Sequence, residues 1–121
     1  MQLFLIVIFG SIGVGLRYLL TTSSLSLWPN IYFPTLVSNV LGCFLFGLFY
    51  IVFIKQNSSF GMPLTIGLCG GLTTLSSFCF EIIKLLENKN YLLGSCYPLV
   101  ILTTCCLLVY FGIVVGKYIT V

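Results

Sequence analysis

One stretch of sequence decides how this chain folds: Gly67-Leu68-Cys69-Gly70-Gly71-Leu72-Thr73-Thr74-Leu75-Ser76-Ser77-Phe78. It lies in the middle of a long hydrophobic segment, residues 63–86. Lipid offers no partner for a free backbone N–H or C=O, so a membrane helix normally satisfies its own backbone. Adjacent glycines and closely spaced hydroxyl side chains both weaken a helix. The stretch therefore predicts a break in a membrane helix, over residues 70–73.

A helix break at membrane depth is tolerated only where it is buried in protein or lines a wet cavity. It frees carbonyl oxygens and helix ends, which are suitable ligands for ions. The sequence therefore indicates a protein that handles an ion.

The rest of the chain is equally apolar. Of its 121 residues, 60% are hydrophobic and 6% are charged. Four apolar segments reach or approach the ~20 residues that cross a ~30 Å hydrocarbon layer; they are residues 3–20, 33–54, 63–86 and 92–118. The first does not resemble a cleaved signal, because no Lys or Arg precedes it. We predict an all-α membrane protein, a single domain over residues 1–121 with four transmembrane helices.

Several function classes are disfavoured by composition. The chain has no His and no Asp, so it offers no convincing acid–base pair and we expect no enzyme. Its net charge of +3 rests on five basic and two acidic residues, which is too sparse for a nucleic-acid-binding face. The six cysteines fall mostly inside apolar segments, where free cysteine behaves as a small hydrophobic residue.

The positive charges are nearly balanced across the membrane. Lys55 and Lys117 would face one side, Lys84 and Lys89 the other, and Arg17 modestly favours the second group. Two interpretations stay open. Either the chain inserts in both orientations and pairs antiparallel with an identical or similar chain, or a bias of one charge fixes a single orientation.

Two polar side chains inside the spans each allow two interpretations. Arg17 either extends to the interface or creates an electropositive vestibule that concentrates anions. Asn39 either joins helices by hydrogen bonds or lines a pore as a donor to a small anion. Farther along, Glu81 and Lys84 lie three residues apart, which predicts a local ion pair.

Taken together, these segments resemble the bacterial fluoride channels of the Fluc or CrcB family. The resemblance covers nearly the whole chain, and residues 67–81 are its most specific part. The glycine-rich first span that ends at Arg17, and the second span with Asn39 and Gly42, add to it. The family implies a multi-pass protein of the bacterial plasma membrane. It also implies an antiparallel dimer whose interface carries two narrow pores and which passively exports fluoride from the cytoplasm.

The resemblance also implies roles for individual residues. Backbone carbonyls at Gly70 and Thr73 of each subunit would bind a structural sodium ion that is not transported. Asn39, Ser76, Ser77 and Phe78 would line the fluoride pore, and the ring edge of Phe78 would face the ion. Arg17 would lie in the vestibule. Further candidates for pore lining are Tyr97 and Thr104.

At two positions the chain departs from the family pattern. Leu75 stands where the family has a first phenylalanine, and Ile101 stands where it often has a serine. At both positions an aliphatic side chain replaces an aromatic or hydroxyl group of the pore. This loss favours a channel built from two different homologous subunits, of which this chain supplies one. The alternative interpretation is a homodimer in which both pores lack these two groups.

Two other readings compete with a self-sufficient fluoride channel. A small multidrug-resistance exporter also has four short spans, but it needs a carboxylate inside the membrane, and the first span has no acidic residue. The second alternative is a non-conducting partner subunit of a heteromeric fluoride channel, in which the buried polar residues would only support packing.

Overall fold

The computed structural model describes residues 1–27 and 33–120, and its ordered elements are all helical. Helix α1 covers Gln2–Leu27, and α2 covers Phe33–Phe49 and continues into a π-helical turn, η1, over Tyr50–Ile54. The third span is assembled from η2 (Pro63–Cys69), α3 (Gly70–Leu72) and α4 (Leu75–Glu87). Helix α5, Tyr91–Ile119, completes the bundle. Within the described residues, four segments are long and apolar enough to cross a membrane, which confirms the predicted all-α class.

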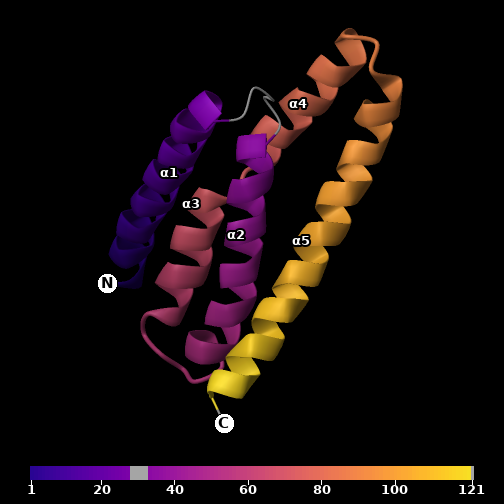
Figure 1. The fold of residues 1–121 in the computed structure, drawn as a ribbon. Coiled ribbons are helices and arrows are strands. Elements are labelled where there is room, and N and C mark those ends of the chain that lie inside the picture. Colours follow the sequence, from indigo (N-terminus) through magenta and orange to yellow (C-terminus); the bar gives the residue numbers. More distant parts are fainter. Residues whose placement is uncertain (28–32, 121) are drawn as a thin grey trace.

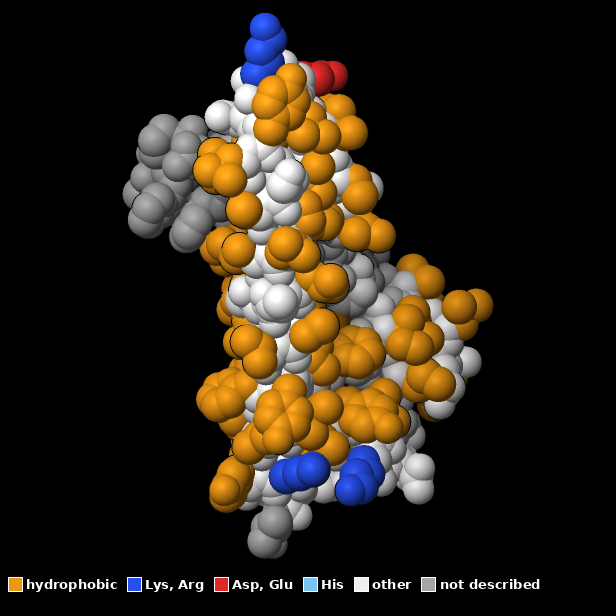
Figure 2. All heavy atoms as spheres, turned by 90° about the vertical axis from the view of Figure 1, so that its right-hand side faces the viewer, with side chains coloured by type: hydrophobic (Ala, Val, Ile, Leu, Met, Phe, Trp, Pro, Cys, Tyr) orange, Lys and Arg blue, Asp and Glu red, His pale blue; other side chains and the backbone are white. Residues whose placement is uncertain are grey.

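The spans alternate in direction, so the N- and C-termini lie at the same end of the bundle (Figure 1). Consequently α1 runs parallel to the third span, and α2 runs parallel to α5. On the face where α5 lies in front, apolar side chains cover the middle, and the visible Lys and Arg side chains lie only at the two ends (Figure 2). This distribution suits a protein whose middle faces hydrocarbon.

Glycines bring the helix backbones together in both parallel pairs. A Cβ on Gly67 would lie 2.7 Å from the Ile6 carbonyl oxygen, and one on Gly71 would lie 3.1 Å from the Val14 amide nitrogen. In the other pair, a Cβ on Gly47 would meet the Val109 carbonyl and lie 3.0 Å from the Ile113 amide nitrogen. Small residues at helix interfaces allow this close approach in membranes.

The break in the third span differs in position from the prediction. The helix continues through Gly70 and Gly71 to Leu72, and only Thr73 (φ −80°, ψ 151°) and Thr74 (φ −146°, ψ 119°) are extended. The prediction over residues 70–73 was wrong for the glycines, because Gly71 has helical geometry and serves the contact with α1. The two threonines form the break, and Thr74 caps α4 by accepting a hydrogen bond from the Ser77 N–H.

The π-helical turns were not anticipated from the sequence. In η1 the Lys55 N–H donates to the Tyr50 carbonyl at 3.0 Å, and the Ser58 N–H donates to the Phe53 carbonyl at 2.9 Å. These i→i+5 bonds widen the end of the second span just before the chain turns into the third. Such turns are rare, and no local sequence pattern marks them.

We predict that Gly47→Ala destabilises the bundle by about 1–3 kcal/mol, because the new methyl group meets the backbone of α5, which cannot rotate away. The free energy of unfolding in detergent micelles measures this. Gly15→Ala is the matched control, since outside its own helix turn no heavy atom of the described residues lies within 4 Å of the added Cβ. Equal stability of the two variants would contradict the backbone contact between α2 and α5.

Candidate functional site

The centre of the molecule is a reciprocal pair of hydrogen bonds between Asn39 and the break. The Thr74 N–H donates to Asn39 Oδ1 at 2.7 Å, and Asn39 Nδ2 donates to the Thr74 carbonyl at 3.2 Å. Both residues are buried. The amide side chain of α2 thus replaces the helical partners that Thr74 lacks. Of the two sequence-based interpretations of Asn39, joining helices describes these bonds directly.

A cavity of about 230 Å³ opens on one side of this pair. Asn39 and Phe78 both line it, so two of the predicted pore residues come together there. The Phe78 ring is half-buried and packs against Tyr97, with ring centroids 5.6 Å apart and planes at 44°. The complete lining is Asn39, Cys43, Thr73, Thr74, Leu75, Phe78, Ile101, Leu102 and Cys105.

The two positions that depart from the family pattern share this cavity. Leu75 is 73% exposed at the start of α4, whereas Ile101 on α5 is 5% exposed. Aliphatic side chains therefore share the lining of this cavity with the amide of Asn39. An aliphatic group lacks the electropositive edge of an aromatic ring and the donor of a hydroxyl group. This cavity is consequently more apolar than the family pattern implies.

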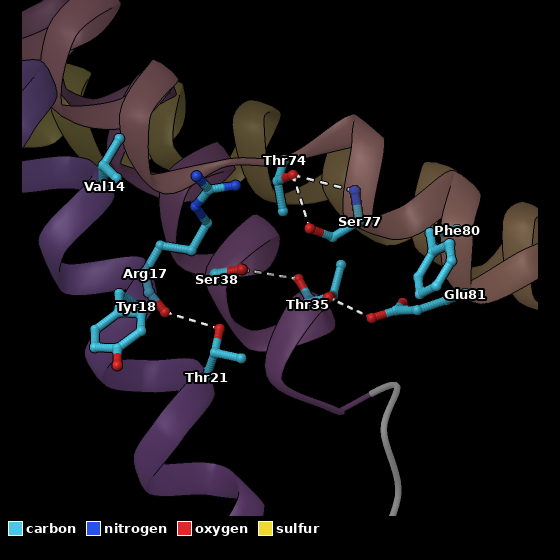
Figure 3. A pocket seen from close by; sticks show the side chains of 10 residues that line it. All are labelled: Val14, Arg17, Tyr18, Thr21, Thr35, Ser38, Thr74, Ser77, Phe80 and Glu81. Carbon is cyan, nitrogen blue, oxygen red and sulfur yellow. Dashed lines mark hydrogen bonds between the residues drawn. The ribbon is translucent and has the colours of Figure 1, made fainter.

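A larger cavity of about 460 Å³ lies on the other side of the break, between α1, α2 and α4 (Figure 3). Arg17 reaches from α1 toward this space, and Ser38 and Ser77 face it from α2 and α4. The complete lining is Val14, Arg17, Tyr18, Thr21, Thr35, Ser38, Thr74, Ser77, Phe80 and Glu81. One guanidinium group and several hydroxyl groups thus face a common space.

Glu81 is held inside this region by hydrogen bonds from two other helices. It is 4% exposed; Thr35 of α2 donates to Oε1, and Tyr97 of α5 donates to Oε2 at 2.6 Å. The expected ion pair with Lys84 was wrong, because the Lys84 Nζ instead lies 4.7 Å from the centre of the Phe80 ring. Sequence analysis missed this network, although an acidic residue inside a span is by itself a signal of function.

The hydroxyl groups after the break are divided between different environments. Thr74 Oγ1 contacts Ser76 Oγ at 3.2 Å and Ser77 Oγ at 3.2 Å. Ser77 is half-buried and lines the larger cavity, whereas Ser76 is exposed and lines neither described cavity. Of the two predicted pore serines, only Ser77 therefore shares a described cavity with Arg17. Neither lines the cavity that contains Phe78.

The remaining predicted site residues lie around these cavities. Thr73 lines the smaller cavity, and its N–H donates to the Cys69 carbonyl at 2.9 Å. Gly70 is exposed, and no heavy atom lies within 4 Å of the place where a Cβ would stand. Tyr97 contacts both Phe78 and Glu81. Thr104 is half-buried on α5 and lines neither described cavity.

Comparison with known proteins places this architecture in a family. Residues 4–113 match the family described as "CrcB-like protein, Camphor Resistance (CrcB)". A "Fluoride-specific ion channel FluC" of Escherichia coli O1:K1 is 40% identical over 94 residues, which cover 75% of each chain. The protein of that name from Phocaeicola vulgatus is 44% identical over 93 residues, covering 74% of this chain and 77% of the relative. That from Geotalea uraniireducens is 35% identical over 118 residues, covering 93% and 94%.

The chain belongs to the CrcB family. Membership confirms the resemblance drawn from residues 67–81 and agrees with the expectation that the protein is a channel and not an enzyme. Together with the four spans, it also confirms a multi-pass bacterial membrane protein. CrcB membership argues against the small multidrug-exporter alternative.

We predict that Asn39→Asp lowers the free energy of unfolding of this CrcB protein by about 2 kcal/mol, because the donor to the Thr74 carbonyl is lost and a second acceptor replaces it. Chemical unfolding in detergent measures the change. Thr103→Val is the control, since its hydroxyl group bonds only to carbonyls of its own helix. An Asn39→Asp protein as stable as this control would contradict the central role of the amide.

Proposed function

We propose that this chain forms a fluoride-selective channel that passively exports fluoride from the cytoplasm. The observation that carries the proposal is the meeting of Asn39 and Phe78 in one cavity beside a helix break. Relatives that are 35% and 44% identical to this chain carry the name fluoride-specific ion channel, which supports fluoride as the permeating ion.

The chemistry of the lining suits a small anion. Asn39 Nδ2 has two N–H groups, and among the described residues only Thr74 accepts from it. The second N–H can therefore donate into the cavity that Asn39 lines. The electropositive edge of Phe78 adds a weak attraction that would not trap the ion. These groups would replace part of the hydration shell of fluoride, and the larger chloride ion would be excluded by the narrow passage.

Passive conduction is sufficient for export. An inside-negative potential of 100 mV favours outward movement of a monovalent anion by ~2.3 kcal/mol, which corresponds to a roughly fiftyfold concentration ratio. Arg17 would raise the local anion concentration at the entrance, because it lines the larger cavity, where the carboxyl group of Glu81 is already hydrogen-bonded to Thr35 and Tyr97. No coupling ion is required by this scheme.

We further infer that two subunits assemble in antiparallel orientation. The nearly even distribution of Lys residues at the two ends of the bundle supports insertion in both orientations. The partner is either a second copy or a homologous subunit. Leu75 and Ile101 make the cavity of this chain more apolar, which favours a homologous partner that supplies the more complete pore. In that arrangement this chain would be the subunit whose pore has fewer polar and aromatic groups.

A structural sodium ion at the subunit interface fits the backbone at the break. Because the Thr74 N–H donates to Asn39, the Gly70 carbonyl loses the partner that a continuing helix would supply. Gly70 is exposed, and Thr73 is extended, so their carbonyls can reach an ion between subunits. Two carbonyls are too few for a hard cation, and the same pair from a partner would complete the shell. The bound ion would neutralise converging carbonyl dipoles and join the subunits.

We predict fluoride efflux from liposomes that contain this chain alone, measured with a fluoride electrode and with chloride as the control anion. Rapid efflux of fluoride but not chloride would establish a self-sufficient channel and would contradict the need for a homologous partner. Efflux only after a homologous subunit is added would make the chain half of a heteromeric channel. Absence of fluoride efflux from folded protein in both preparations would overturn the proposed function.

A substitution of Phe78 tests whether fluoride passes through the smaller cavity. Where this chain conducts alone, Phe78→Leu should lower the fluoride rate by at least about tenfold, because the aromatic edge is replaced by an aliphatic group. Phe4→Leu is the matched control, since Phe4 is 68% exposed on α1 and lines neither cavity. Equal rates for the two variants would place the ion path elsewhere.

We also predict that sodium stabilises the assembled protein. A ligand at 100 times its dissociation constant adds about 2.7 kcal/mol to the free energy of unfolding, so the melting temperature should rise with sodium concentration. Potassium at the same ionic strength is the control, because the larger ion fits the same carbonyl shell poorly. Identical melting curves in sodium and potassium would argue against the sodium site.

A further inference from the structure

Two cysteines from neighbouring helices line the smaller cavity. Cys43 on α2 and Cys105 on α5 are both half-buried, and both line the cavity of about 230 Å³. The other four cysteines lie outside this lining. Cys79, Cys96 and Cys106 are exposed, and Cys69 is buried in η2.

The backbone contact between α2 and α5 fixes this proximity. Gly47 of α2 packs against the backbone at Val109 of α5, and each thiol lies one helical turn before one of these two residues. Since the two helices run parallel, the turns that precede the contact also lie next to each other. The close contact between the two helices therefore places the two cysteines on neighbouring turns of α2 and α5.

A pair of thiols selects a particular class of metal ion. Thiolates are soft ligands and prefer soft cations over hard ones such as sodium. Within residues 1–27 and 33–120 no third Cys, His or acidic ligand joins the pair, so a four-ligand zinc site is not formed. Two sulfur ligands without a third suit a cation that accepts linear two-coordinate geometry.

The charge of the two thiolates narrows the choice of metal ion further. When a divalent soft cation such as Hg²⁺ binds, two S–H bonds break, two S–Hg bonds form, and two protons leave to water. No electron is transferred, and the bound group is neutral. Two thiolates balance the charge of a divalent cation, whereas a monovalent cation held by the same pair would leave one negative charge.

We propose that Cys43 and Cys105 form a binding site for a soft, two-coordinate divalent cation, represented by Hg²⁺, and that the bound ion obstructs the smaller cavity. Asn39 and Phe78 line the same cavity, so the metal would occupy the space that fluoride would need. This second consequence rests on the proposed function. The binding site itself does not.

The binding test uses the full chain in detergent with its three exposed thiols replaced, Cys79→Ser, Cys96→Ser and Cys106→Ser. Titration with mercuric nitrate is followed by the ultraviolet absorbance of the mercury–thiolate bond and by proton release. We expect an endpoint at one Hg²⁺ per chain with two protons released for each ion. In competition with a monothiol, adding Cys43→Ser or Cys105→Ser should each weaken binding by at least about tenfold.

Cys69→Ala is the matched control, because its thiol is also buried but lies outside the cavity lining. Its Hg²⁺ affinity should equal that of the parent. An unchanged affinity in both the Cys43→Ser and the Cys105→Ser protein, or an equal loss in Cys69→Ala, would overturn the site. Gel filtration confirms that each variant is folded, and having two single substitutions keeps the test decisive if one misfolds.

Fluoride efflux provides the second readout. Hg²⁺ should abolish efflux from liposomes containing the parent protein, whereas the Cys43→Ser and Cys105→Ser proteins, each compared with its own rate before Hg²⁺ is added, should lose much less. Efflux that persists with Hg²⁺ bound to both thiols would overturn the obstruction. If the parent conducts no fluoride either alone or with a homologous subunit, the proposed function fails, while the titration still decides whether the metal site exists.

Discussion

The structure depends on the pairing of the Asn39 side chain with the backbone of Thr74. A break in a membrane helix leaves N–H and C=O groups without water to satisfy them, and each unsatisfied group costs several kcal/mol. One amide supplies both an acceptor and a donor in the geometry of a backbone peptide, at 2.7 and 3.2 Å. The break can therefore persist in the middle of the bundle, and α4 can leave the direction of α3 (Figure 1).

Glycine contacts supply the rigid frame around this break. Gly67 and Gly71 press the first half of the third span against α1, while Gly47 and Gly112 press α2 against α5. Both contacts are made through backbone atoms, which cannot rotate away as side chains can. At the beginning of α4, by contrast, Leu75 is 73% exposed. Thr74 belongs to the lining of both cavities, so both lie at the junction between α3 and the tilted α4 (Figure 1).

The four spans and the existence of a break could be predicted from the sequence, because the spans follow from the length of the hydrophobic segments and the break follows from residues that weaken helices. The predicted position of the break was wrong, because a glycine can either interrupt a helix or allow close packing. Only the contact of Gly71 with Gly10 of the facing helix shows that it allows packing here. Asn39 could be singled out, but its partner at Thr74 is distant in sequence. The contacts of Glu81 with Thr35 and Tyr97 were missed for the same reason.

A path for an anion through such a bundle must remain stable when no ion occupies it. Among the described residues, every buried side-chain nitrogen and oxygen atom has a hydrogen-bond partner. The proposed fluoride donors therefore cannot be unpaired groups that wait for an ion, since those would destabilise the empty protein. Asn39 resolves this conflict, because one N–H holds the break while the other remains available. A donor of this kind attracts an anion without binding it so tightly that conduction stops.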